Sequence, residues 1–324
     1  MSKNYIENVA IVGVAGHVGQ YITEALLKTG KHKVTAITRE DSTSTLPEGV
    51  IAKKVNYNDQ KSLVDALQGQ DALVITMSVF APPDTQTKLI EAAATANVPW
   101  ILPNEFGGDP VNAEMNKDNM LGEGKTKYRN QIEELGKSSW IAIACGFWYE
   151  FSLAGGPYRY GFDFKNKSLT LFDDGNTKIN TSTFPHCGRA VASLLSLKIS
   201  SDGESDKSPC LTDFKNKPAY IASFTVSQND MFDSVLRVTG AESKDWKITK
   251  VPVKEYYQQG VEQFKAGDRV GFAKLLYGRA FFPESSANFG ATKGLHNDIL
   301  GLPKEDIDEY TKVALKIVES GAEY

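Results

Sequence analysis

Cysteine is scarce in this sequence, which has Cys145, Cys187 and Cys210 among its 324 residues. The three lie far apart, are odd in number and form no Cys-x-x-Cys pair, so the pattern indicates neither a disulfide framework nor a zinc site. We therefore expect no metal centre and a reducing compartment, the cytoplasm.

The sequence also lacks an excess of positive charge and any long apolar run. Its 36 Lys and Arg residues are outnumbered by 40 Asp and Glu, which gives a formal charge of −4 and disfavours binding to nucleic acid or anionic lipid. No run approaches the roughly 18 apolar residues of a spanning helix, and no apolar signal region follows Met1. We expect a small-molecule partner, no nucleic acid, no membrane, and a monomer or homodimer.

The first half of the chain contains a regular alternation of strand and helix patterns. Such an alternation, here from residue 9 to residue 142, is typical of βα units that form a parallel sheet. Expected strands cover residues 8–13, 33–38, 51–55, 72–77, 100–103 and 140–144, with helical patterns at 59–67 and 85–97. The sequence thus predicts an α/β fold built on a doubly wound Rossmann sheet.

The alternation changes near residue 151. Residues 169–180 fit a β-hairpin around an Asp-Asp-Gly-Asn turn, whereas a helix at 188–197 and a strand at 220–226 fit a return to the sheet. We therefore expect two interleaved domains: an NAD(P)-binding Rossmann domain over 1–150 with returns near 186–199 and 219–226, and a smaller, mainly substrate-binding domain over 151–324.

A glycine motif follows the first expected strand and opens the first helix. Gly13, Gly16 and Gly19 have the GxxGxxG spacing of extended and atypical short-chain dehydrogenases. The first glycine permits a tight turn, the second lets the backbone approach a pyrophosphate, and the third allows close packing of helix on strand. The alternative is a glycine turn that serves packing alone. We expect a dinucleotide site that also includes His17 and Val18.

Arg39 ends the second expected strand, roughly 20 residues after the glycine motif. An acidic residue there would bind the ribose 2′-hydroxyl of NAD, whereas an arginine can pair with the 2′-phosphate of NADP. The alternative is an exposed arginine in a polar loop. We expect NADPH, in a site completed by residues near the ends of the fourth and fifth strands and on the following helix, namely Thr76, Met77, Ser78, Asn104 and Lys125.

The sequence lacks several familiar catalytic motifs. The helix before the sixth strand has no Tyr-x-x-x-Lys, and neither Gly-x-Ser-x-Gly nor His-Glu-x-x-His occurs. On that helix Lys125 shares an otherwise apolar stripe with Leu121, Tyr128, Ile132 and Leu135. A lysine that faces a pocket loses hydration and becomes able to exchange a proton near neutral pH. The alternative is a lysine whose ammonium reaches back to water.

Two segments resemble a known family. Leu102-Pro103-Asn104-Glu105-Phe106-Gly107 and the stretch 125–133 are similar to the isoflavone reductases and phenylcoumaran benzylic ether reductases, NmrA-like atypical short-chain dehydrogenases. The resemblance covers roughly the first 200 residues, and fungal NmrA-like oxidoreductases are closer overall than the plant enzymes. The resemblance implies that Lys125 is the catalytic lysine. Asn104 departs from the serine of the plant enzymes, and residues 145–149 also differ, so substrate identity does not transfer.

An aromatic cluster follows the sixth expected strand, on the side where open α/β sheets bind ligands. Together with two residues after the fifth strand it predicts a substrate pocket of Glu105, Phe106, Phe147, Trp148 and Tyr149. The alternative for each aromatic residue is a place in the core.

These observations predict an NADPH-dependent reductase of a conjugated or aromatic small molecule, such as a secondary metabolite. Hydride would come from the nicotinamide, with Lys125 as the acid–base group acting directly or through water. Two alternatives remain at this stage. One is a non-catalytic NmrA-like protein that senses NADP(H), and the other is an isomerase or dehydratase that retains its cofactor.

Overall fold

The computed structural model describes residues 3–78, 81–120 and 122–321. Its largest element is a parallel sheet of seven strands in the order β11-β6-β5-β4-β1-β2-β3. The strands are β1 (Asn8–Val12), β2 (Lys33–Arg39), β3 (Ile51–Val55), β4 (Ala72–Ile75), β5 (Trp100–Leu102), β6 (Ser139–Ala144) and β11 (Lys217–Tyr220). The Rossmann-like α/β fold predicted from the sequence is confirmed.

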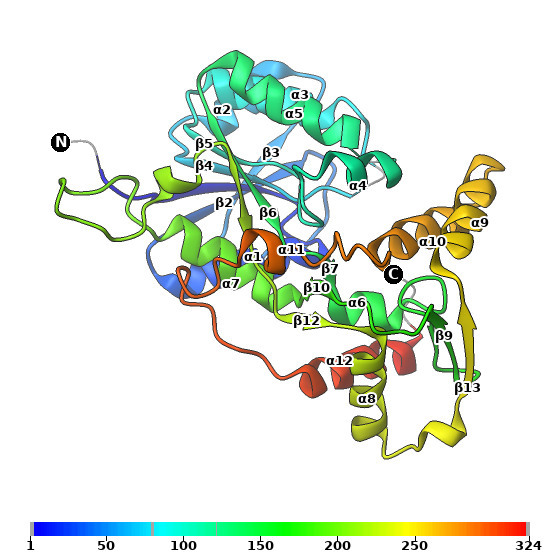
Figure 1. Ribbon diagram of the computed structural model, residues 1–324. Helices are drawn as coiled ribbons and strands as arrows, with labels where there is room; N and C mark the ends of the chain where they lie inside the picture. The colour runs from blue at the N-terminus through cyan, green and yellow to red at the C-terminus, as the bar shows by residue number, and fades with distance from the viewer. Residues whose placement is uncertain (1–2, 79–80, 121, 322–324) are drawn as a thin grey trace.

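Helices cover both faces of this sheet (Figure 1). One pair packs on one face, and three helices that contact one another in sequence order pack on the other. The pair is α1 (His17–Thr29) and α7 (Phe184–Leu195), and the three are α2 (Gln60–Leu67), α3 (Thr85–Thr95) and α5 (Gly122–Leu135).

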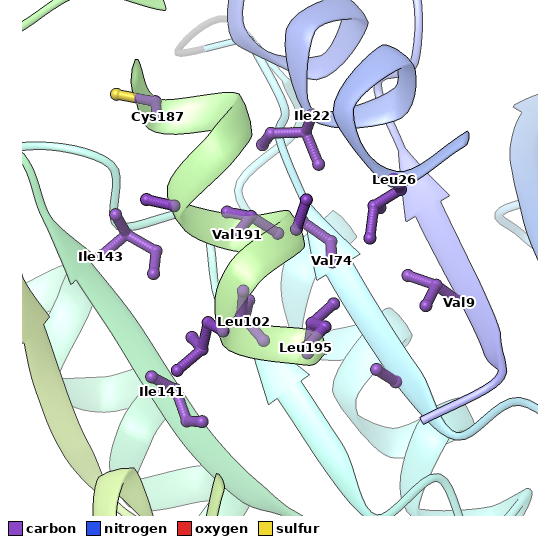
Figure 2. Close-up of a cluster of buried hydrophobic side chains, with 14 of the residues drawn as sticks. Val9, Ile22, Leu26, Val74, Leu102, Ile141, Ile143, Cys187, Val191 and Leu195 are labelled. Carbon is purple, nitrogen blue, oxygen red and sulfur yellow. The ribbon is translucent and has the colours of Figure 1, made fainter. Parts of the chain in front are cut away.

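The core between α1, α7 and the sheet is shown in Figure 2. Ile22 of α1 and Leu195 of α7 are fully buried against strand residues such as Val74, and each such side chain contributes roughly 1.5–3 kcal/mol by leaving water. Gly188 permits the close approach of the two helices, because a Cβ there would lie 2.4 Å from the carbonyl oxygen of Tyr21. A segment far along the chain thus completes the N-terminal layer.

The rest of the chain forms a second region beside the carboxyl ends of the strands (Figure 1). Two three-stranded sheets form its frame: β7 (Phe147–Trp148), β10 (Ile179–Ser182) and β12 (Phe224–Val226) in one, and β8 (Phe162–Asp163), β9 (Ser168–Phe172) and β13 (Lys247–Val251) in the other. The remaining α-helices are α4 (Ala113–Asp118), α6 (Tyr149–Ala154), α8 (Gln228–Thr239), α9 (Val253–Lys265), α10 (Arg269–Ala280), α11 (Phe289–Lys293) and α12 (Ile307–Ser320), with 3₁₀ turns at Leu211–Phe214 and Ser243–Asp245. Within the described residues, none of the helices has the length and apolar character needed to cross a membrane.

Two predictions for this region are wrong. The expected hairpin over 169–180 does not form, because β9 pairs with β8 and β13 whereas β10 pairs with β7 and β12. The expected strand over 220–226 is two strands in different sheets, β11 beside β6 and β12 beside β10. β9 thus forms its local antiparallel pair with the preceding β8, and its other partner, β13, like the partners of β10, β11 and β12, lies far away in sequence, where local turn residues carry no information.

Candidate functional site

The glycine loop between β1 and α1 is packed so closely that side chains are excluded from it. Gly13 has φ +88°, and a Cβ there would lie 1.9 Å from the carbonyl oxygen of Thr76. A Cβ on Gly19 would lie 2.0 Å from the carbonyl oxygen of Gly13. The Thr76 hydroxyl donates to the carbonyl oxygen of Val12 at 2.7 Å, which fixes the end of β4 against the loop. Gly13 therefore permits the tight turn and Gly19 the close packing, as expected from the sequence.

The N-terminus of α1 is left without a side-chain cap. Its N-cap is Gly16, whereas Thr183 caps α7 and Ser227 caps α8. The first backbone N–H groups of a helix lack intrahelical partners and favour an anion. His17 begins the helix with its ring 6.0 Å from that of Phe184.

Val18, in the first turn of α1, and Arg39, at the end of β2, have different environments. The Val18 side chain is buried in the core, so its backbone is the part that can face a ligand. Arg39 ends β2 with 73% of its side chain exposed, and its Nε lies 3.6 Å from Asp41. A guanidinium in this position is open to a phosphate. The sterically closed glycine loop, the uncapped helix and this arginine together fit a dinucleotide that carries a 2′-phosphate.

Asn104 joins the ends of β4 and β5. Its side-chain amide donates to the carbonyl oxygen of Met77 at 3.1 Å, and its Oδ1 accepts from the Met77 N–H at 3.2 Å. The Asn104 N–H donates in turn to Gln86 at 3.1 Å. Ser78 follows, exposed, just before residues outside the described part of the chain. Asn104 thus shapes the rim of the site through the backbone, a role open to an amide that donates and accepts at once.

Lys125 projects from α5 toward the turn that follows β5. A Cβ on Gly107 would lie 3.7 Å from its Nζ, and Gly107 is itself held by hydrogen bonds to the end of β6. Burial lowers the pKa of Lys125, the charges of Glu105 and Cys145 oppose that shift, and Arg129 adds to it. The ammonium therefore lies at the carboxyl ends of β5 and β6.

Glu105 and Arg129 are buried beside this lysine. Glu105 is 2% exposed and Arg129 6% exposed, with Arg129 Nε 3.5 Å from Glu105 Oε1. Burial raises the pKa of Glu105, and the charges of Arg129 and Lys125 oppose the rise. The sequence analysis assigned Glu105 to the substrate pocket and missed Arg129. Arg129 lies four residues after Lys125, the spacing of neighbours on one helix face, and that spacing could have revealed it.

The predicted apolar stripe on α5 is partly wrong. Leu135 is 40% exposed, whereas Ile132 is buried in the core. Tyr128 is half-buried, and its hydroxyl donates to the carbonyl oxygen of Pro83. Leu121 lies outside the described residues. The last three residues of the helix, 133–135, are exposed, so the apolar stripe ends at Ile132.

The aromatic residues after β6 separate into two groups. Phe147 is half-buried and stacks on Tyr277 of α10 with ring centroids 4.1 Å apart. Trp148 is half-buried and lies 5.1 Å from the ring of Phe184. Tyr149 is fully buried, with its hydroxyl hydrogen-bonded to Thr311 at 2.7 Å. The assignment of Tyr149 to the pocket is corrected, because the first residue of α6 faces the core of the second region.

Phe106, the remaining predicted pocket residue, is half-buried against the core between the sheet and α1. It follows Glu105 directly and precedes the turn on which Lys125 rests. The structure therefore gathers Phe106 with Glu105 and Lys125 and places Phe147 and Trp148 after the neighbouring strand β6.

Known proteins resemble this chain in sequence and in fold. Residues 6–154 match the NmrA-like family. Oxidoreductase aprR of Aspergillus flavus is 27% identical over 323 residues, which covers 95% of this chain and 98% of that protein. A solved structure described as AtPrR2 with NADP+ and (+)pinoresinol is 21% identical with a TM-score of 0.74, covering 96% of this chain and 99% of that one.

A solved isoflavone reductase has a similar fold, with a TM-score of 0.72 at 20% identity and coverage of 96% of this chain and 99% of that one. The structural matches extend over nearly the whole chain. The family match is shorter, but its residues 6–154 include the glycine loop, Arg39 and Lys125. Residues 6–154 thus match the NmrA-like family, and over almost all of its length the chain has the fold of the isoflavone and pinoresinol-lariciresinol reductases.

Proposed function

We propose that this protein is an NADPH-dependent reductase of a conjugated or aromatic small molecule, with Lys125 as its acid–base group. The chain is an oxidoreductase of the atypical short-chain dehydrogenase type, and its cofactor is NADP(H). The proposal adds the kind of substrate and the role of the lysine.

The observation that carries the proposal is the place of Lys125. A series of contacts leads from the glycine loop to this lysine. Thr76 is hydrogen-bonded to the carbonyl oxygen of Gly13, Met77 is hydrogen-bonded to Asn104, and the turn after Asn104 contains Gly107, which lies next to the lysine ammonium. A lysine whose pKa is lowered by burial exchanges protons more readily near neutral pH than an exposed one. Its ammonium thus lies at the same edge of the sheet as the dinucleotide loop.

Different residues of the chain would bind the cofactor and transfer the proton. The glycine loop and the uncapped N-terminus of α1 would hold the pyrophosphate, and Arg39 would pair with the 2′-phosphate. Bound NADPH supplies hydride to an electrophilic carbon of the substrate. Lys125 delivers a proton to the adjacent substrate oxygen, either directly or through one water.

The aromatic side chains argue for a flat substrate. Phe147 stacks on Tyr277, so its orientation is fixed before any ligand binds, and the following residue, Trp148, packs on Phe184. Rigid aromatic walls with few polar groups suit aromatic ligands. Among the relatives, the flax protein named bifunctional pinoresinol-lariciresinol reductase 2 and the AtPrR2 complex with pinoresinol concern substrates of this chemical class.

The test is a screen for NADPH consumption with aromatic enones, benzylic ethers and lignans, each checked for a reduced product by mass spectrometry. We expect at least one class to oxidise NADPH stoichiometrically with product. A product formed without net loss of NADPH would instead indicate an isomerase or dehydratase. Tight NADPH binding with no turnover, and a protein complex that depends on the redox state of the cofactor, would indicate a sensor.

A further inference from the structure

Glu105 is an unusual buried carboxylate. It is 2% exposed, and among the described residues neither of its oxygens accepts a hydrogen bond. Glu305, in contrast, accepts from the hydroxyls of Thr183 and Tyr310 at 2.9 and 2.8 Å. A buried carboxylate without hydrogen bonds is costly unless nearby charge compensates it. The charges that face Glu105 are those of Arg129 and Lys125.

Arg129 is held in place beside Glu105 by contacts of its own. Its NH2 group donates to the carbonyl oxygen of Pro110 at 2.9 Å and to Thr126 at 3.1 Å, and its guanidinium lies 5.2 Å from the ring centroid of Trp140. Arginine keeps its charge at every pH of interest. Two positive groups therefore act on one carboxylate, and of the two cations Lys125 is the one whose charge can change.

We propose that Glu105 and Arg129 are positioning residues that set the proton affinity of Lys125 in opposite directions, Glu105 retaining the proton on the ammonium and Arg129 favouring its release. This inference deepens the proposed function and rests on it for its catalytic meaning. It gives the unbonded carboxylate of Glu105 a reason: a carboxylate saturated by hydrogen bonds would be a weaker partner for a titrating lysine.

The groups around Lys125 come from three elements. Glu105 follows β5, Cys145 follows β6 and Arg129 shares α5. Beyond Arg129, the hydroxyl of Tyr220 donates to the buried Asp109 at 3.0 Å, and Arg129 acts electrostatically on that tyrosine. A charge within about 4–6 Å shifts a pKa by roughly 1–3 units, so the loss of one neighbour is measurable.

The experiment reads the titration of Lys125 without using turnover. The folded protein is acetylated briefly with limiting acetic anhydride over a range of pH, and peptide mass spectrometry gives the labelling of each lysine, with the exposed Lys127 as internal reference. We expect Glu105→Gln to move the Lys125 midpoint down by about 1 pH unit and Arg129→Gln to move it up by a similar amount. Unchanged midpoints, or shifts in the same direction, would overturn the proposal.

Two controls keep the outcome clear. If Glu105→Gln fails to fold, the upward shift in Arg129→Gln alone decides, because a merely structural arginine would leave the midpoint where it is. The pH profile of kcat/KM is then recorded for the same variants. Shifted midpoints with an unshifted profile would retain the charge effect and reject Lys125 as the acid–base group, whereas unshifted midpoints reject the charge effect itself.

Discussion

The two walls of the candidate site are built in different ways. The cofactor wall depends on backbone packing between residues close to strand ends, as where a Cβ on Gly19 would lie 2.0 Å from Gly13. The opposite wall depends on side-chain pairs that are distant in sequence: Phe147 stacks on Tyr277 of α10, and α10 is joined to α4 by Arg279 and Asp118 at 2.6 Å.

The difference shows which part of the site is constrained by dinucleotide binding and which part can vary with the substrate. A glycine loop that admits no Cβ serves any chain that binds a dinucleotide in this manner. The paired side chains of the second wall have no such constraint, so they can change with the substrate while the cofactor wall stays the same. Substitutions in the two walls should therefore have separable effects.

The largest effect is expected from Gly19→Ala, which tests the cofactor wall. Its Cβ would collide with the carbonyl oxygen of Gly13, a backbone atom that cannot move alone. We expect a loss of about 3 kcal/mol in unfolding free energy and at least a tenfold loss of NADPH affinity, measured by urea unfolding and by quenching of tryptophan fluorescence. Gly203→Ala, with no atom within 4 Å of its Cβ, is the matched control. Equal behaviour of the two variants would contradict the packing argument.

Arg279→Gln should damage the second wall and spare the first. The Arg279 side chain is 1% exposed, pairs with Asp118 and with Glu284 at 3.2 Å, and so joins α10 to α4. Breaking a buried pair costs about 3 kcal/mol, while NADPH affinity should stay unchanged. Arg237→Gln removes an ion pair whose arginine is 54% exposed, where the cost is below about 1 kcal/mol. An equal loss of unfolding free energy in both variants would contradict the claim that the buried pair holds the second wall together.

Glu150 connects the two regions, and its effect depends on pH. Its Oε1 accepts from the N–H of Phe184 at 2.9 Å, and burial raises its pKa to about 7 from 4.5. Between these values the unfolded chain has already released the proton that the folded protein keeps, so this group lowers stability as pH rises.

The variant Glu150→Gln cannot ionise and should remove that loss. Relative to the wild type, its unfolding free energy should increase by about 3 kcal/mol as the pH rises from 4.5 to 7. Urea unfolding at several pH values measures the difference. A difference independent of pH would show that Glu150 titrates at its ordinary value in the folded protein.

The smallest effect is expected from Arg39→Gln. The exposed guanidinium should contribute about 1.4 kcal/mol to binding of a 2′-phosphate, a factor of about ten in affinity. NADPH titration should therefore show a tenfold weaker complex, with the affinity for NADH unaltered because NADH lacks that phosphate. An equal weakening for both nucleotides would indicate that Arg39 supports the loop rather than the phosphate.

The contrast between the walls also explains which features could be predicted from the sequence and which could not. The glycine loop, the six strands before residue 145 and the place of Lys125 follow from local patterns: residue spacing, apolar runs and helix periodicity. The hairpin over 169–180 was wrong because β9 and β10 find partners in distant segments. Tyr149 was misplaced because its hydrogen-bond partner, Thr311, is distant in sequence. Arg129 was missed although its spacing of four residues from Lys125 puts both on one helix face, because its buried partner Glu105 lies in another segment of the chain.

The central claim is that Lys125 handles the proton in an NADPH-dependent reduction. Its most direct test compares kcat at saturating NADPH for the wild type, Lys125→Ala and Lys127→Ala, with a substrate found in the screen. We expect Lys125→Ala to reduce kcat on the order of 10²- to 10⁴-fold, and Lys127→Ala, at an exposed position on the same helix, to retain it. Undiminished turnover by Lys125→Ala would contradict the account.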